Sequence, residues 1–277
     1  MSALSEKQIK DYNKALSLFQ SGQFRDAEGV LKRLYKAAPE HTEINALLAD
    51  CRFMTGKYDV ALRDYARALR LDPNLAGAWK RIGHIEFAIK NNLAVAIEML
   101  SKALALNPTD AETYYLLGTI SQQMVQHADS AQMFQIGLQL APKHAEMRAA
   151  LALSQLDLRD FDAVKSNILQ ALKDAPQSDM VIVTALKISE VLPFSDDEET
   201  MIRKIAKENA GRGDLLSYVA TYEAQRAMAE KDYDAALKIL QDVDDKHLSI
   251  APTKYFYLGK IYLSRKQYDQ SFAAYER

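Results

Sequence analysis

The sequence predicts an all-α fold, a right-handed α-solenoid superhelix built from antiparallel helix pairs. The first observation is the placement of prolines, which recur at separations of 34, 35, 34 and 34 residues. These prolines are Pro39, Pro73, Pro108, Pro142 and Pro176. Proline cannot continue a helix and pushes the preceding residue out of the α region, so each one marks a helix end followed by a turn. A fixed period of this length indicates stacked helical repeats.

The second observation is a set of fixed positions before each proline. Twelve residues before it stand Ala27, Ala61, Ala96, Ser130 and Val164; eight before it stand Leu31, Tyr65, Leu100, Phe134 and Ile168; five before it stand Leu34, Ala68, Ala103, Gly137 and Ala171. Separations of four and three residues place these side chains on one face of a helix. This face belongs to the second helix of each unit, and its small residues let neighbouring helices approach closely.

The third observation is the low glycine content, 10 residues in 277, about half the usual share of roughly 7%. This counts against folds that use glycine in turns and phosphate loops.

The first helix of each unit has its own pattern, clearest as Trp79, Ile82 and Gly83 in the third unit and Tyr114, Leu117 and Gly118 in the fourth. A short polar turn follows, and an aromatic residue such as Tyr58 closes it.

These motifs resemble the tetratricopeptide repeat. The best unit carries Trp79, Ile82, Gly83, Ala96, Leu100, Ala103 and Pro108, and the last carries Tyr255, Leu258, Gly259, Tyr262 and Tyr268. We expect five clear units in residues 1–176 and a divergent helical unit or inter-block connection in 177–213. Two degenerate units are expected in 214–277, the last one truncated. In the divergent segment Ser195 is the expected helix N-cap, followed by acids that suit the positive helix end.

Composition narrows the function classes. The 35 Lys and Arg residues balance 37 Asp and Glu residues, which gives no electrostatic reason to expect nucleic acid or an anionic membrane surface. The single cysteine, Cys51, excludes an internal disulfide framework and a thiolate metal cluster. The polar N-terminus lacks a signal-peptide core, and no apolar run reaches the roughly 18 residues of a membrane span. We therefore expect a cytoplasmic protein.

No catalytic constellation is present in the sequence. No pair of histidines has metal-ligand spacing on one helix face, and no glycine-rich phosphate loop occurs. We expect a protein that is not an enzyme, with no cofactor and no metal. An enzyme with a site hidden in the groove is the least favoured alternative, because nucleophile, base and orienting partner are nowhere grouped.

The resemblance implies a binding site on the concave face, which the first helices of the units line in this family. The expected groove residues are Tyr12, Phe19, Asp50, Phe53, Met54, Lys80, His84, Phe87, Tyr115 and Gln122. Among them Phe19, Phe53, Phe87 and Tyr115 are the preferred partner contacts, because exposed aromatic side chains rimmed by polar groups mark interaction surfaces. Others, such as Leu16, have the alternative of packing sideways between first helices.

The expected partner is a protein or peptide, either an apolar helix or an extended segment. The carboxylate clamp found in some members of this family needs an asparagine where this chain has Leu16, Asp50 and His84. Lys80 and Arg81 alone do not make such a clamp, so we do not expect binding of chaperone tails.

Two C-terminal stretches, 255–263 and 267–275, are similar to the last repeat of bacterial tetratricopeptide-repeat sulfotransferases. This resemblance implies a catalytic domain beyond residue 277, since the family's Pro-x-Ser-Gly-Thr loop is absent from all 277 residues. The alternative is a stand-alone adaptor. The last helix lacks a polar cap, so we also expect self-association through this end as an alternative to a following domain.

Overall fold

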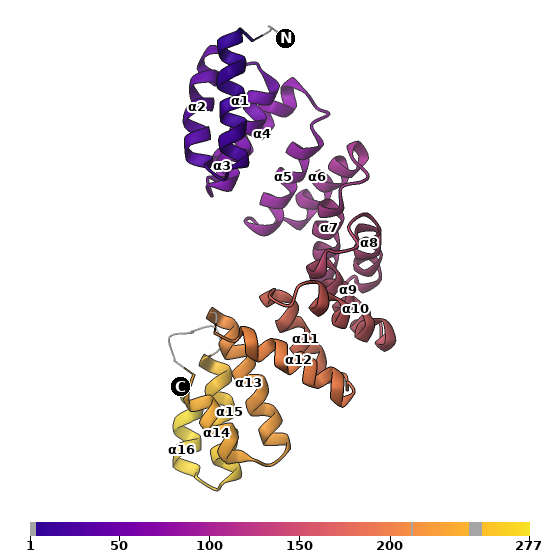
Figure 1. Ribbon diagram of the computed structural model, residues 1–277, viewed down its shortest axis with the longest axis vertical. Coiled ribbons are helices and arrows are strands. Elements are labelled where there is room, and N and C mark those ends of the chain that lie inside the picture. The colour runs from indigo at the N-terminus through magenta and orange to yellow at the C-terminus, as the bar shows by residue number, and fades with distance from the viewer. Residues whose placement is uncertain (1–3, 212, 244–250) are drawn as a thin grey trace. The chain divides into compact units, whose positions relative to one another are not determined.

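The computed structural model of the protein describes residues 4–211, 213–243 and 251–277 (Figure 1). Sixteen α-helices and no strand occur in this described part of the chain. Backbone contacts divide the chain into two compact units, Met1–Ala141 and Pro142–Arg277. The predicted all-α solenoid of helical repeats is therefore confirmed.

Each unit contains four helix pairs. The first unit contains α1 (Glu6–Gln20), α2 (Phe24–Ala37), α3 (Thr42–Met54), α4 (Tyr58–Leu71), α5 (Ala76–Ala88), α6 (Leu93–Leu106), α7 (Ala111–Gln123) and α8 (His127–Leu140). The second contains α9 (Ala145–Asp157), α10 (Phe161–Asp174), α11 (Asp179–Val191), α12 (Asp196–Asn209), α13 (Gly213–Ala229), α14 (Tyr233–Gln241), α15 (Ala251–Ser264) and α16 (Tyr268–Tyr275). Figure 1 shows the two helices of a pair, such as α1 and α2, side by side.

The periodic prolines end the second helix of each pair, as the sequence predicts. The helices α2, α4, α6, α8 and α10 all end two residues before their proline. In the third repeat the turn is fixed by Trp79, whose Nε1 donates a hydrogen bond to the carbonyl oxygen of Pro73 at 2.8 Å. The ammonium of Lys102 lies 4.7 Å from the centre of the Trp79 ring, so the indole joins α5 to α6.

The core follows the predicted repeat positions. Leu31, Tyr65, Leu100, Phe134 and Ile168, eight residues before the prolines, are all fully buried. Glycine allows two of them, Leu100 and Phe134, to approach the first helix closely. A Cβ atom on Gly83 would lie 2.7 Å from Cγ of Leu100, and one on Gly118 would lie 2.5 Å from the Phe134 ring. In these two pairs the large side chain of the second helix therefore packs directly on the glycine backbone of the first, whereas the equivalent positions of the other three repeats are the buried Ala15, Ala49 and Ala152.

The turn inside seven of the eight pairs contains a residue in the left-handed region, and the turn between α11 and α12 does not. Gly22 and Gly56 take this conformation in the first two pairs, with φ near 77° and 75°. Later pairs use non-glycine residues there, among them Asn91 and Val125, with φ of 51° and 61°. Left-handed backbone is uncommon for side chains other than glycine and asparagine, and least common for β-branched ones. The backbone shape of the turn is thus kept while its chemistry varies.

Residues 177–213, where the repeat pattern is weakest, hold α11 and α12. Ser195 is the N-cap of α12, and its hydroxyl accepts from the backbone N–H of Glu198 while the Glu198 carboxylate accepts from that of Ser195. This confirms the predicted cap and completes a capping box. Asp196 and Asp197 occupy the first turn of α12, where the helix dipole favours negative charge.

A buried group of charges joins α2, α3 and α4. Glu28 on α2 and Asp64 on α4 are each 4% exposed, and Arg52 on α3 contacts both carboxylates. Lys57 and Lys32 also reach Glu28, at 2.7 and 2.9 Å. Burial alone raises the pKa of a carboxyl, but the hydrogen bonds from Lys57, Lys32 and Arg52 lower the pKa of Glu28 to about 2.

No helix in the described residues is long and apolar enough to cross a membrane.

Candidate binding surface on the first helices

All ten predicted groove residues lie in the first unit, on α1, α3, α5 and α7. Met54 is exposed, and the other nine are half-buried. Contacts between α1 and α3, and between α5 and α7, place first helices next to each other. The predicted residues therefore lie on successive first helices, each with part of its side chain open to solvent.

The aromatic residues use their covered parts to pack within the repeats. Phe19 packs edge-on against Phe24, with ring centres 5.2 Å apart. Phe53 packs in the same way against Tyr58 at 5.8 Å, and Phe87 lies against the core cluster of α6 and α7. Each ring thus belongs partly to the core and partly to the surface, which the sequence alone did not show.

A second set of contacts joins α3 to α5. The ring of Phe53 lies 5.4 Å from that of His84, and the guanidinium of Arg81 lies 4.8 Å from the Phe53 ring centre. A cation over an aromatic face is attracted by the ring quadrupole. Phe53 is therefore held between α3 and α5.

The carboxylate of Asp50 accepts a hydrogen bond from a residue of the core. The hydroxyl of Tyr65 donates a hydrogen bond to Oδ1 of Asp50 at 2.6 Å. Burial raises the pKa of Asp50, and this effect exceeds the opposing influence of the Tyr65 hydrogen bond and of Arg81 and Lys80. Burial also raises the pKa of Tyr12, helped by the nearby carboxylates of Glu43 and Asp50.

Lys80 is engaged by acids of the following repeat. Its Nζ lies 3.0 Å from Oδ2 of Asp110 and 2.6 Å from Oε2 of Glu112. His84, one turn further along α5, is half-buried, and burial followed by the charge of Arg81 lowers its pKa. The positive charge at this surface is therefore largely neutralised by the chain's own carboxylates.

Sequence reasoning missed the residues that hold this surface together. The sequence predicts Tyr65 only as a core residue and predicts no role for Asp110 and Glu112. The available signal was their placement around the start of the fourth repeat, about 30 residues after Lys80 and therefore one repeat away. Arg81 was considered only as part of an incomplete clamp, whereas it lies over Phe53.

The described residues contain no group of three or more His, Cys, Asp or Glu side chains placed to hold a metal. Burial raises the pKa of the Cys51 thiol to about 12, so this cysteine is a poor nucleophile.

Comparison with known proteins gives a family match for part of the chain. A family model described as "Tetratricopeptide repeat" matches residues 12–76. The BBSome complex member BBS4 of Mus musculus is 29% identical over 118 residues, which are 43% of this chain and 22% of that protein. The Xenopus tropicalis counterpart is 32% identical over 113 residues, with 41% and 22% covered. The chain thus spans about a fifth of the length of the curated relatives it matches.

Solved structures share the fold at low sequence identity. PilW, described as a widely conserved type IV pilus biogenesis factor, has a TM-score of 0.67 at 16% identity, covering 78% of this chain and 99% of that one. PilF of Pseudomonas aeruginosa has a TM-score of 0.63 at 17% identity, covering 73% and 90%. Residues 12–76 are therefore similar to the tetratricopeptide repeat, and the chain has the helical-repeat fold of these proteins over most of its length.

Proposed function

We propose that this chain is a non-catalytic protein-binding scaffold, and that the first-helix surface of the first unit binds an apolar helix or an extended segment. One observation carries the proposal. Phe19, Phe53 and Phe87 recur at separations of 34 residues, on α1, α3 and α5, each half-buried with part of its ring open. Repeated aromatic side chains of this kind supply most of the energy of an interface when a partner covers them.

Charge favours an apolar partner over a free carboxylate terminus. Lys80 contacts Asp110 and Glu112, and Arg81 lies over Phe53 with Glu112 3.7 Å away. A partner carboxylate would compete with these two acids for the same cations. Covering the open ring edges requires no such exchange, since burial of apolar area is favourable by itself.

The test changes Phe53 and Phe87 together to Ser and measures the affinity for a partner first captured from the source cells. Because both rings also touch the core, Phe53→Leu with Phe87→Leu is the conservative form. Leu106→Ser with Leu140→Ser is the matched control, since both are exposed apolar residues on second helices. We expect the phenylalanine variants to lose at least about tenfold in affinity and the control to lose none. Unchanged affinity for the partner, with intact helicity, would overturn the assignment of the first-helix surface as the binding site.

A narrower candidate is that the scaffold serves a sulfotransferase whose catalytic domain lies beyond residue 277. It rests on the sequences of α15 and α16, where Tyr255, Leu258 and Gly259 are followed by Tyr268. An antibody raised to this chain, used on lysate of the source cells, separates the candidates by mass. A band near 31.1 kDa favours a stand-alone adaptor, and a band larger by a domain favours a recognition region. Light scattering tests self-association through α16. If the chain forms a dimer, the measured mass is twice that of the single chain.

The cytoplasm is the compartment we propose for this scaffold. The single, buried Cys51 supports it, because cysteines there are kept reduced and unpaired. A fluorescent fusion followed through cell fractionation tests this assignment.

A further inference from the structure

A groove runs between α1 and α2 in the first unit, separate from the first-helix surface described above. It has a volume of about 590 Å³. Leu18 of α1 and Val30 of α2 form its apolar floor, and Gly29 of α2 also lines it, with no atom within 4 Å of where its Cβ would be. The missing side chain at position 29 therefore leaves open space over an apolar floor.

Cations surround this floor. Lys14 on α1 and Arg25 and Arg33 on α2 line the groove, and Asp26 is the only acid among its described lining residues. All four side chains are exposed, and none of them forms an ion pair within the described residues. Arg52 and Lys57 of the next repeat differ from them, since both contact Glu28.

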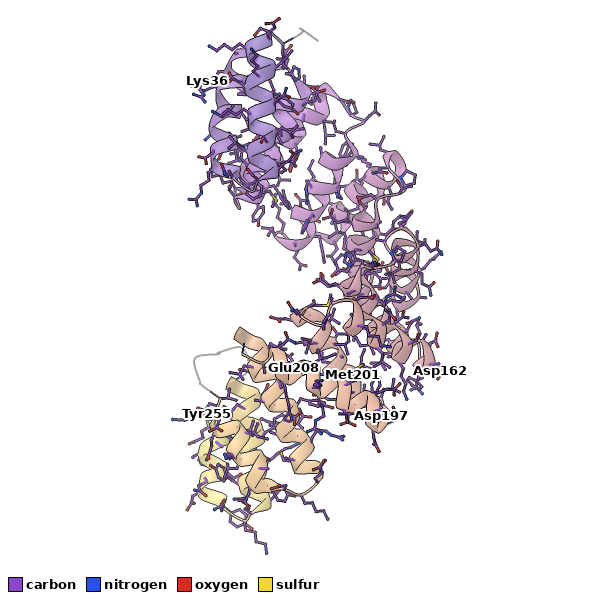
Figure 2. The ribbon with its side chains drawn as sticks, viewed as in Figure 1. Lys36, Asp162, Asp197, Met201, Glu208 and Tyr255 are labelled. Atoms are coloured by element: carbon purple, nitrogen blue, oxygen red, sulfur yellow. The ribbon has the colours of Figure 1, made fainter. Side chains whose placement is uncertain are left out.

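The positive charge extends along both helices. Lys10 lies one turn before Lys14 on α1, and Lys36 lies three residues after Arg33 on α2; both are exposed. Lys36 projects from the outer side of the helix pair, where it is labelled in Figure 2. Exposed cations on both helices thus flank the groove at Leu18 and Val30.

We propose that this groove binds an acidic amphipathic helix of a partner protein. A third helix fits the groove between two packed helices, with apolar residues at i, i+3, i+4 and i+7 on the floor. The glutamates and aspartates beside those residues would meet Lys14, Arg25 and Arg33. Charge complementarity of this kind raises association rates and selects against basic partners.

Three synthetic peptides test the groove by isothermal titration calorimetry. The first peptide has leucines at helical spacing and glutamate at all remaining positions. The second replaces each glutamate of the first with glutamine. The third replaces each leucine of the first with serine. We expect the first to bind at least about ten times more tightly than either of the others. Equal binding of the glutamine peptide, equal binding of the serine peptide, or no binding of the first would each overturn the proposal.

Variants of the protein localise the binding. Gly29→Met fills the groove without a clash and exchanges glycine for a better helix former, so the fold is retained. Gly77→Met is the matched control, because Gly77 is also a helical glycine with open space around it. We expect at least about a tenfold loss of affinity for the first peptide in Gly29→Met and none in Gly77→Met.

Charge reversal provides the second arm. Lys14→Glu with Arg33→Glu should abolish binding, whereas Arg63→Glu, an exposed cation on α4, should leave it unchanged. Equal affinity of Gly29→Met and the unaltered protein would overturn the groove assignment. Binding of vesicles of anionic lipid with the same dependence on Gly29 would also overturn it, in favour of a membrane surface.

Discussion

At the scale of single residues, the glycines of the first helices show how one missing methyl group sets the closeness of a repeat. Gly83 on α5 and Gly118 on α7 lie against Leu100 and Phe134, which are fully buried. The same residue type has the opposite meaning at Gly77, where nothing lies within 4 Å. The structural role of a helical glycine therefore depends on which face of the helix it occupies.

Gly83→Ala is expected to destabilise the protein by about 1–3 kcal/mol, because the new Cβ would lie 2.7 Å from Cγ of Leu100 and 3.2 Å from the carbonyl oxygen of Ala96. Urea unfolding followed by far-ultraviolet circular dichroism measures the change. Gly77→Ala on the same helix is the control and is expected to gain up to about 1 kcal/mol, since alanine is the better helix former. A gain in both variants would contradict the close packing at Gly83.

At the scale of helices, charge joins elements that the apolar pattern does not distinguish. Arg52 of α3 lies between Glu28 of α2 and Asp64 of α4, in a group that is nearly closed to solvent. Removing one member of a buried charge group leaves the others uncompensated, so such a group tolerates little change. It fixes which faces of three successive helices meet.

The dependence of the unfolding free energy on acidic pH follows from the buried charge group around Glu28. The pKa of Glu28 is lowered from its ordinary 4.5 to about 2 in the folded chain. A lowered folded pKa contributes stability that is full above the unfolded pKa and is lost as the pH falls toward the folded one. The unfolding free energy is therefore expected to fall between about pH 5 and pH 2, and Glu28→Gln is expected to reduce that slope.

Urea titrations at several pH values measure the slope. Glu98→Gln is the control, because Glu98 pairs with Lys102 in an exposed contact one turn away on the same helix. Equal slopes for Glu28→Gln and the unaltered protein would contradict the assignment to Glu28.

Much of the helical architecture is predictable from the sequence. Helix ends follow from the fixed geometry of proline, and buried positions such as Tyr65 and Leu100 follow from the repeat period. The engagement of Lys80 by Asp110 and Glu112 was not predictable, because it depends on side-chain reach between repeats. The double role of Phe53 was missed for the same reason, since its contacts with Tyr58 and His84 come from different helices.

At the scale of the whole molecule, the contacts between helices join helices that are close together in the sequence. Each helix packs against those close to it in sequence, as expected for stacked repeats whose stability is a sum of unit and neighbour terms. A disturbance in one repeat should therefore weaken its neighbours and leave distant repeats unchanged.

Leu100→Ala tests this locality. Leu100 is fully buried on α6, so the substitution is expected to cost about 2–5 kcal/mol. Amide hydrogen exchange should lose protection in α5 to α8 and keep it in α13 to α16. Leu106→Ala on the same helix is the control, because Leu106 is exposed and should change little. A uniform loss of protection along the chain would show instead that the repeats unfold as one cooperative body.

The placement of Trp79 has a practical consequence for all such measurements. It is the only tryptophan of the chain, and its indole spans the turn at Pro73 and the side chain of Lys102 in the first unit. Intrinsic emission excited at the indole band therefore reports the opening of the third repeat and is blind to the second unit. Where this signal and the helical signal change at different denaturant concentrations, their difference measures how far the two units melt independently.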